Sequence, residues 1–302
     1  MAKVISFVNF KGGVGKTTLA VEIAASLYKK FNARILMIDL DPQSNCTFYW
    51  MSPEDWKEHD KKQGTLWNFY NASLEGEDFD ISSIIAEPTR YLRRPLYQSH
   101  DEELNRVIEI IPSHIELFGI DLRLATKFGS ENLKAQLLLK QALKKIKDDY
   151  DFIFIDSPPN LNITVQNGLF ASDFYVIVAL AEYLSTLGIA HIQNLINQLF
   201  ENANSLFDEE MYPEPELLGI IFNRLRYLTG GTSNEKKWIN QLRDEYENII
   251  FDTTLPQSQK IAERPEQCEP MALSDYAADF NYSQRIHELA NEFYERIENF
   301  EE

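Results

Sequence analysis

The chain has 302 residues, of which 44% are hydrophobic and 25% are charged, as in an ordinary globular protein with room for one large α/β core. Its 47 acidic and 29 basic residues give a net charge of −18, which argues against a uniformly basic nucleic-acid-binding surface. The two cysteines, Cys46 and Cys268, are far apart and form no CxxC pair, so the usual zinc and iron–sulfur patterns are excluded.

The sequence contains no segment suited to a membrane. No apolar run approaches the roughly 20 residues that a membrane-spanning helix needs, and the chain enters a predicted strand without a signal-peptide pattern. We therefore expect a cytoplasmic protein that forms a single domain over residues 1–302.

A glycine-rich turn separates the first predicted strand from the first predicted helix. The strand is the apolar run at residues 4–8, and the helix covers residues 19–30. Glycines in such a turn let the backbone approach a polyphosphate, and the following helix adds the positive end of its dipole. Strand, turn and helix in this order are the context of a phosphate-binding loop. We therefore predict a nucleotide site formed by Gly12, Gly13, Val14, Gly15, Lys16, Thr17 and Thr18.

The end of this loop predicts the cofactors. Lys16 is expected to reach the β- and γ-phosphates of a nucleotide, and the Thr17 hydroxyl is expected to ligate Mg²⁺. We therefore expect ATP and Mg²⁺ as cofactors, with Lys16 among the catalytic residues.

Two later predicted strands end in carboxylates. The apolar run before Asp39 and Asp41 is one, and the run before Asp156 is the other. Because parallel strands bind ligands at their carboxyl ends, all three aspartates are expected near the nucleotide. Asp156 has the position of a Walker B carboxylate, which holds Mg²⁺ directly or through a water. For Asp39, a structural role at the strand end is an equally open interpretation.

The remaining pattern predicts the fold class. Apolar runs that alternate with helical periodicity indicate a mostly parallel, twisted sheet flanked by helices on both faces, the α/β fold of P-loop NTPases. The segment 46–106, rich in aromatics and charges, is predicted to be a peripheral, variable part, and residues 281–302 to form an amphipathic acidic helix. The other predicted elements are helices at 66–74, 133–147, about 182–201 and 234–246, and strands at 107–111, 174–180, 217–223 and 249–251, the last followed by a stop at 253–256.

The run Lys-Gly-Gly-Val-Gly-Lys-Thr-Thr at residues 11–18 resembles the deviant Walker A motif of the ParA/MinD ATPases (SIMIBI class). The resemblance implies that Lys11 crosses a dimer interface to the phosphates of the partner's ATP; a solvated surface lysine is the alternative. Asp-x-Asp-Pro-Gln from Asp39 is similar to the second signature of the family. That similarity implies that Asp41 lies near the attacking water, in the second shell of the metal, and is needed for hydrolysis.

Two further passages extend the resemblance. Asp-x-Pro-Pro-x-Leu from Asp156 resembles the switch element of the family, which responds to the γ-phosphate. Asn223 and the chain around Pro256 are similar to the passages that contact the adenine base. For Asn223, a turn-forming role is the alternative.

The resemblance also implies a surface along which the protein acts, namely non-specific DNA, called its track here. In DNA-binding members of the family, basic residues near residues 224–264 face DNA, and this stretch holds seven Lys/Arg against six Asp/Glu in an otherwise acidic chain. Any contact should be with phosphates and independent of base sequence, and a solvated or salt-bridged surface is the alternative. The candidates are Arg226 and Lys260, with Lys236, Lys237 and Arg264 as helpers.

The resemblance as a whole implies a ParA-type partition ATPase. ATP would close a homodimer that binds non-specific DNA on the nucleoid, and hydrolysis stimulated by a ParB-like or cargo adaptor protein would release it. The alternative is a MinD-like or other cargo-positioning ATPase that does not use DNA. An acidic C-terminal helix argues against a membrane partner, because anionic lipids attract Lys and Arg. An electron-transfer protein like the nitrogenase iron protein is disfavoured by the cysteine spacing.

Overall fold

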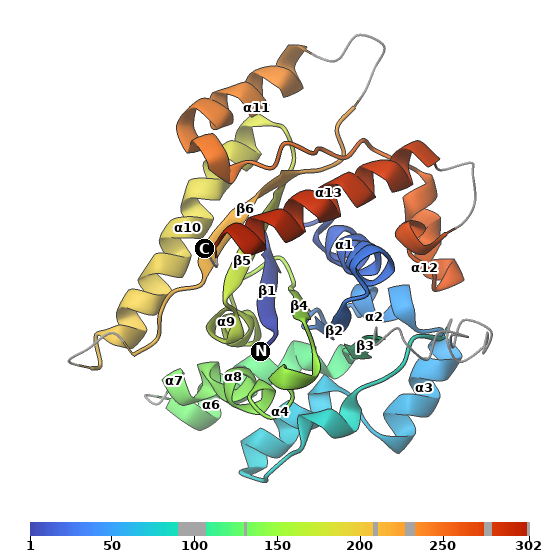
Figure 1. Ribbon diagram of the computed structural model, residues 1–302. Coiled ribbons are helices and arrows are strands. Elements are labelled where there is room, and N and C mark those ends of the chain that lie inside the picture. The colour runs from blue at the N-terminus through green and yellow to red at the C-terminus, as the bar shows by residue number, and fades with distance from the viewer. Residues whose placement is uncertain (90–106, 130–131, 208–210, 227–232, 275–279, 301–302) are drawn as a thin grey trace.

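A six-stranded sheet forms the centre of the computed structural model, and every neighbouring pair of strands in it is parallel (Figure 1). The strand order is β3-β2-β4-β1-β5-β6, as expected for a parallel α/β sheet. The structure describes residues 1–89, 107–129, 132–207, 211–226, 233–274 and 280–300. The strands are β1 (Lys3–Val8), β2 (Arg34–Asp39), β3 (Val107–Ile111), β4 (Phe152–Asp156), β5 (Phe174–Ala179) and β6 (Glu216–Phe222).

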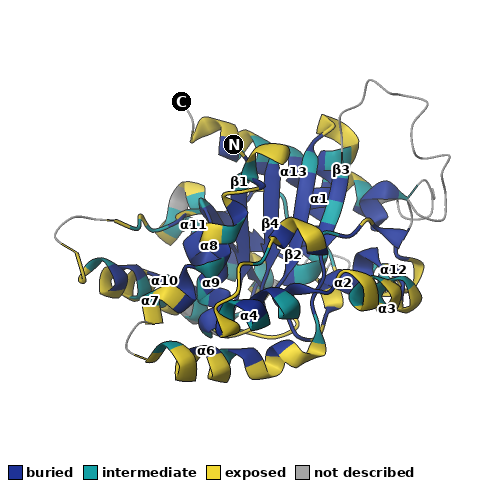
Figure 2. Ribbon diagram, turned by 90° about the horizontal axis from the view of Figure 1, so that it is seen from below, coloured by how far each residue is buried: buried dark blue, intermediate teal, exposed yellow. Residues whose placement is uncertain are grey.

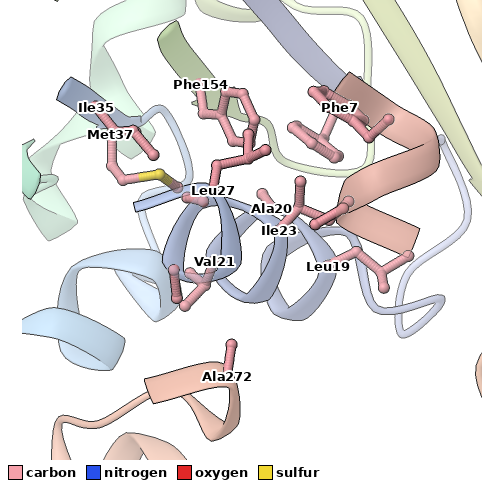
Figure 3. Packing of buried hydrophobic residues seen from close by; sticks show 14 of the residues in the cluster. Phe7, Leu19, Ala20, Val21, Ile23, Leu27, Ile35, Met37, Phe154 and Ala272 are labelled. Atoms are coloured by element: carbon pink, nitrogen blue, oxygen red, sulfur yellow. The ribbon is translucent and has the colours of Figure 1, made fainter. Parts of the chain in front are cut away.

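Helices cover both faces of the sheet. Alternate strand residues point to opposite faces, so Phe7 and Phe154 pack on one side and Val4 and Ile153 on the other. Helices α1 and α13 lie on the first face, where Figure 3 shows Phe7 and Phe154 against α1. The helices are α1 (Lys16–Phe31), α2 (Asn45–Trp50), α3 (Pro53–Lys62), α4 (Leu66–Glu75), α6 (Ile120–Phe128), α7 (Asn132–Gln136), α8 (Leu138–Leu143), α9 (Ile163–Ala171), α10 (Tyr183–Asn204), α11 (Ser233–Tyr246), α12 (Arg264–Gln267) and α13 (Phe280–Asn299).

The prediction of one continuous helix at residues 133–147 is wrong. The structure divides it into α7 and α8. The Asn167 side chain on α9 causes the break: its Nδ2 donates to the Ala135 carbonyl at 2.7 Å, and its Oδ1 accepts from the Leu139 N–H at 3.0 Å. These two backbone groups would otherwise bond to each other, so the amide takes the place of one helical hydrogen bond.

The prediction of a strand at 249–251 is also wrong. Only isolated bridges, Ile220 to Ile250 and Leu225 to Pro256, join this segment to the chain around β6 within the described residues. The Phe251 N–H donates to the Ile220 carbonyl at 3.0 Å and the Leu255 N–H to the Phe222 carbonyl at 3.2 Å, but no continuous ladder forms among the described residues. Side chains of α13 bind other backbone groups of the segment: Arg296 donates to the Ile250 carbonyl at 2.7 Å, and Glu292 accepts from two N–H groups at 2.8 and 2.9 Å. The apolar pattern therefore reflects burial with only partial pairing to β6: Phe251 and Leu255 belong to the core cluster that includes α13, and Ile250 to the cluster that includes α10.

The predicted C-terminal helix is present as α13, and its apolar side belongs to the core. The Phe293 ring lies 5.4 Å from the Phe154 ring and 6.3 Å from the Phe7 ring. In the predicted segment 46–106, Trp50 and Tyr70 are buried, and residues 90–106 lie outside the described part, as do residues 301–302. Among the helices that the structure describes, none is both long and apolar enough to cross a bilayer.

Candidate nucleotide site

The loop between β1 and α1 is anchored at both ends. It starts at the centre of the sheet, because β1 lies between β4 and β5. The Asn9 side chain fixes its start, with Nδ2 donating to the Val178 carbonyl at 2.6 Å and Oδ1 accepting from the Lys11 N–H at 2.8 Å. Gly15 ends it with a φ of 92°, a left-handed conformation that glycine adopts without strain. The predicted phosphate loop is thus a turn held between strand and helix.

Lys16, the first residue of α1, is buried next to this loop. It is 7% exposed, and its Nζ donates to the Asn9 carbonyl oxygen at 3.0 Å. Burial lowers the pKa of the Lys16 ammonium, while the carboxylates of Asp156 and Asp41 oppose that shift. A buried ammonium with nearby carboxylates is suited to an anionic ligand that brings its own metal ion.

Thr17 near the start of α1 and the buried Asp156 at the end of β4 form a hydrogen-bonded pair. The Thr17 hydroxyl donates to Asp156 Oδ2 at 2.6 Å, and the buried Oδ1 makes no hydrogen bond with the described residues. Burial raises the pKa of Asp156 to about 7, against the opposing effects of the Thr17 hydroxyl and the Lys16 charge. A hydroxyl and a carboxylate with a spare oxygen match the ligands that Mg²⁺ prefers, so this pair fits a Mg²⁺ ion.

The two aspartates after β2 have different surroundings. Asp39 is fully buried and accepts hydrogen bonds from the Asp41 N–H at 3.0 Å and from the Thr47 N–H and hydroxyl at 2.8 and 2.7 Å. Burial raises the pKa of Asp39 well above its usual value. These contacts favour the structural interpretation of Asp39. Asp41 is 8% exposed and lines the cavity described next, so its carboxylate faces the site.

A cavity of about 580 Å³ lies over the phosphate loop. Asn223 and Pro256 both line it, as do the aromatic rings of Tyr49 and Tyr282, which the sequence reading missed. From the predicted set, the structure brings together in this cavity Gly12, Gly13, Val14, Gly15, Lys16, Thr17, Thr18, Asp41, Asn223 and Pro256.

Arg224 is a further residue of this cavity that the sequence reading did not single out. Its Nη1 donates to the Gly13 carbonyl at 2.7 Å, so its guanidinium lies against the phosphate loop. The residue adopts a φ of 57°, a left-handed conformation that is unusual for an arginine and that recurs at functional sites. The available signal was its position just after the predicted strand at 217–223, but the backbone conformation of a residue cannot be predicted from such a position.

Lys11 does not line the cavity of its own chain. Its ammonium pairs with the Glu182 carboxylate, and the two side chains are 44% and 47% exposed. In the single chain, Lys11 is therefore one half of an exposed surface ion pair. Its expected role across a dimer interface stays a prediction.

The candidate DNA-binding residues are only partly brought together. Arg226 and Lys260 are exposed, and so are Lys236 and Lys237 near the start of α11. The Arg226 N–H donates to the Glu235 carboxylate at 3.1 Å, which brings the start of α11 next to Arg226. Arg264 is different. It is 6% exposed and donates to Gln267 at 3.3 Å, so we withdraw it as a candidate contact for DNA phosphates.

Comparison with known proteins connects this geometry to a family. The model of an AAA domain (AAA_31) matches residues 2–208, more than half of the chain. The sporulation initiation inhibitor protein Soj of Bacillus subtilis is 28% identical over 275 residues, which are 91% of this chain and 92% of that protein. The chromosome partitioning protein ParA of Myxococcus xanthus is 27% identical over 91% of this chain and 82% of its own.

Solved structures agree on the fold. An ATP complex of a Cyanothece McdA variant superposes with a TM-score of 0.73 at 18% identity, covering 98% of this chain and 96% of that one. A putative plasmid partition protein of Borrelia burgdorferi bound to AMPPNP gives a TM-score of 0.62 at 22% identity, covering 95% and 97%. The chain therefore belongs to the AAA domain family AAA_31 and, within it, to the ParA-type partition ATPases.

Proposed function

We propose that this chain is an ATP-driven partition or positioning ATPase that uses non-specific DNA as its track. The observation that carries the proposal is the hydrogen-bonded Thr17–Asp156 pair, with Lys16 and Asp41 beside it, at the edge of one cavity over a glycine-rich loop. This set supplies a phosphate-binding loop, a cation and two oxygen ligands for a metal, which together suit phosphoryl transfer.

Each residue takes one role in this proposal. Lys16 and the loop N–H groups bind the phosphates, and Thr17 and Asp156 hold Mg²⁺, which when bound supplies positive charge for the transferred phosphoryl group. Asp41 orients the attacking water from the cavity wall. Asn223 contacts the adenine base, for which the neighbouring aromatic rings offer apolar surface.

Closure of a homodimer completes the proposed cycle. Lys11 leaves its surface pair with Glu182 and reaches the ATP of the second copy, as an arginine finger does. The closed dimer holds DNA phosphates through Arg226, Lys260, Lys236 and Lys237, and an adaptor protein stimulates hydrolysis and release. Such a protein would be cytoplasmic and would associate with the nucleoid when ATP is bound.

DNA binding is the part of the proposal that most needs a test, because the chain has a net charge of −18 and DNA is also negatively charged. We would measure retention on non-specific duplex DNA for the Asp41→Ala chain with Mg²⁺, comparing ATP with ADP at about 50 and about 200 mM salt. Lys16→Ala, which should lose nucleotide binding, is the matched control. Retention with ATP alone that falls steeply with salt is expected.

Absence of retention at both salt concentrations would remove DNA from the proposal and favour a positioning ATPase with another track. A membrane track is not favoured by the described structure, since the apolar side of α13 is buried in the core, where Phe293 and Ile297 are at most 2% exposed.

A further inference from the structure

The 3₁₀ turn Ile115–Gly119 and helix α6 carry apolar residues on two opposite sides. The inner side packs on the sheet through Leu117, Ile120 and Leu124, which are at most 1% exposed. A surface helix of a globular protein normally has one apolar side, and a helix that is apolar on both sides is normally covered on both.

The outer side of this segment is exposed in the part of the chain that the structure describes. Ile115, Phe118 and Leu122 are 61%, 64% and 75% exposed, and Ala125 continues the row one turn further. Their spacing puts them on one side of the helix. We call these four residues the outer stripe. Large apolar side chains grouped in this way mark contact sites with other molecules.

The outer stripe lies at the same edge of the sheet as the nucleotide cavity. The segment begins just after β3, and the carboxyl ends of all six parallel strands share that edge. In Figure 2, α6 and the N-terminus lie at opposite ends of the strands, and the turns of α6 away from the sheet are exposed. The edge that carries the stripe is therefore the edge that two ATP-bound copies would bring together.

Hydrogen bonds connect the segment to two nucleotide-site elements. On one side, the Ser113 hydroxyl donates to the Asp41 carbonyl at 2.7 Å. On the other, Asp121 on α6 accepts from the Thr164 N–H at 2.9 Å and from the Asn162 side chain, at the start of the helix that follows the Asp-x-Pro-Pro-x-Leu passage. A movement of that passage on nucleotide binding would therefore be transmitted to α6 through these hydrogen bonds.

The charge of this stretch indicates which molecule binds the outer stripe. Residues 115–127 contain Glu116, Asp121, Arg123 and Lys127, so this stretch is neutral in a chain of net charge −18. A DNA track needs a positive surface, and a basic partner would be drawn to the acidic remainder. Two acidic copies repel each other, so a neutral, apolar patch is the surface on which they can meet.

We propose that the outer stripe is a contact between two copies of this chain in the ATP-bound dimer. The inference rests on the dimer of the proposed function and adds the residues that form its apolar part. In a two-fold dimer the stripe is presented twice, so one substitution changes the interface at two places.

The experiment is sedimentation velocity on the Asp41→Ala chain with Mg²⁺ and ATP. Phe118→Glu and Leu122→Glu are the test variants, and Leu206→Glu, at a residue 67% exposed beyond the end of α10, is the matched control. We expect each test variant to raise the dimer dissociation constant at least about 30-fold, as for a central apolar contact, and the control to leave it unchanged. All variants should bind ATP and melt like the parent, because the positions are exposed.

The outcomes separate the two proposals. Dimerisation of the Phe118→Glu and Leu122→Glu chains equal to that of the parent would overturn the stripe as a contact between copies, leave the ATP-dependent dimer in place and assign the stripe to another protein. A parent that stays monomeric with ATP would overturn both the dimer and the stripe contact. Weakened dimerisation in the Leu206→Glu control as well would also overturn the assignment, since the effect would then be one of added charge.

Discussion

Asn223 lies directly over Gly15 in the nucleotide cavity: its Nδ2 donates to the Val14 carbonyl at 3.0 Å and fills the space that a Cβ on Gly15 would need. The glycine also has a φ of 92°, where other residues are strained. Two independent constraints, the left-handed backbone and the contact with Asn223, therefore require a glycine here. The contact also connects the phosphate loop to the chain that follows β6.

Gly15→Ala should lower ATP affinity at least about 10-fold, because the new methyl group must displace Asn223 and the backbone must leave the left-handed region at a cost of about 1–2 kcal/mol. Calorimetric titration with Mg²⁺ and ATP measures it. Gly188→Ala, at a helical position of α10 with open space around it, is the control and should bind ATP like the parent. Equal affinity in the two variants would contradict the role given to Asn223.

Arg224→Ala should weaken ATP binding, since it removes the guanidinium that donates to the Gly13 carbonyl of the phosphate loop. The neighbouring Arg226→Ala is the matched control. Arg226 is exposed, so its loss should leave ATP affinity unchanged and reduce only the proposed DNA retention. Titration with ATP and retention on duplex DNA should be measured on both variants. If Arg224 serves ATP binding and Arg226 serves DNA binding, the two variants give opposite patterns in these measurements.

The sequence alone was sufficient for the six strands of the sheet, though it also predicted one at 249–251 that is absent from the described structure, and for most of the cavity. A parallel sheet concentrates its signals at strand ends. Buried runs before Asp41 and Asp156 indicate both the strands and the edge where their carboxylates meet. The break at Asn167 could not be predicted, since it depends on a side chain from another helix. Arg224 and the burial of Arg264 were missed for the same reason: both result from tertiary contacts that leave no periodic pattern.

The half-buried His287 of α13 should make the fold sensitive to acid. Its Nδ1 is hydrogen-bonded to the Ser26 hydroxyl at 2.6 Å, and burial, with the charges of Lys30 and Lys29, lowers the pKa of His287 from 6.5 to about 4. The unfolded chain takes up this proton as the pH falls through 6.5, whereas the folded chain does so only near 4, so stability is lost between these values.

His287→Gln should therefore lose about 1 kcal/mol less stability than the parent between about pH 7 and about pH 5, after allowance for solvent at a half-buried position. Urea unfolding at the two pH values measures the difference. An identical loss in parent and variant would mean that other groups carry the acid sensitivity.

Phe293→Ala should destabilise the chain by about 3–5 kcal/mol, because it opens a cavity among the rings of Phe7, Phe154 and Phe251. The control is Phe300→Ala at the end of the same segment. Phe300 is 48% exposed, and its loss should change the free energy of unfolding by less than about 1 kcal/mol. Urea unfolding of the two variants tests whether α13 belongs to the core, and a small effect of Phe293→Ala would instead indicate a helix that can detach.

Lys11→Ala should separate the stability of the monomer from the activity of the dimer. The Lys11–Glu182 pair is exposed, and such surface pairs contribute at most about 1 kcal/mol, so the free energy of unfolding and ATP binding should stay near those of the parent. ATP-dependent dimerisation and hydrolysis should be lost, because the proposed contact with the partner's phosphates is removed. Glu182→Gln is the control: it breaks the same ion pair but leaves the lysine free to cross, so hydrolysis should persist. If Lys11→Ala hydrolyses ATP like the parent, Lys11 is a surface lysine and the role assigned to it in the dimer is wrong.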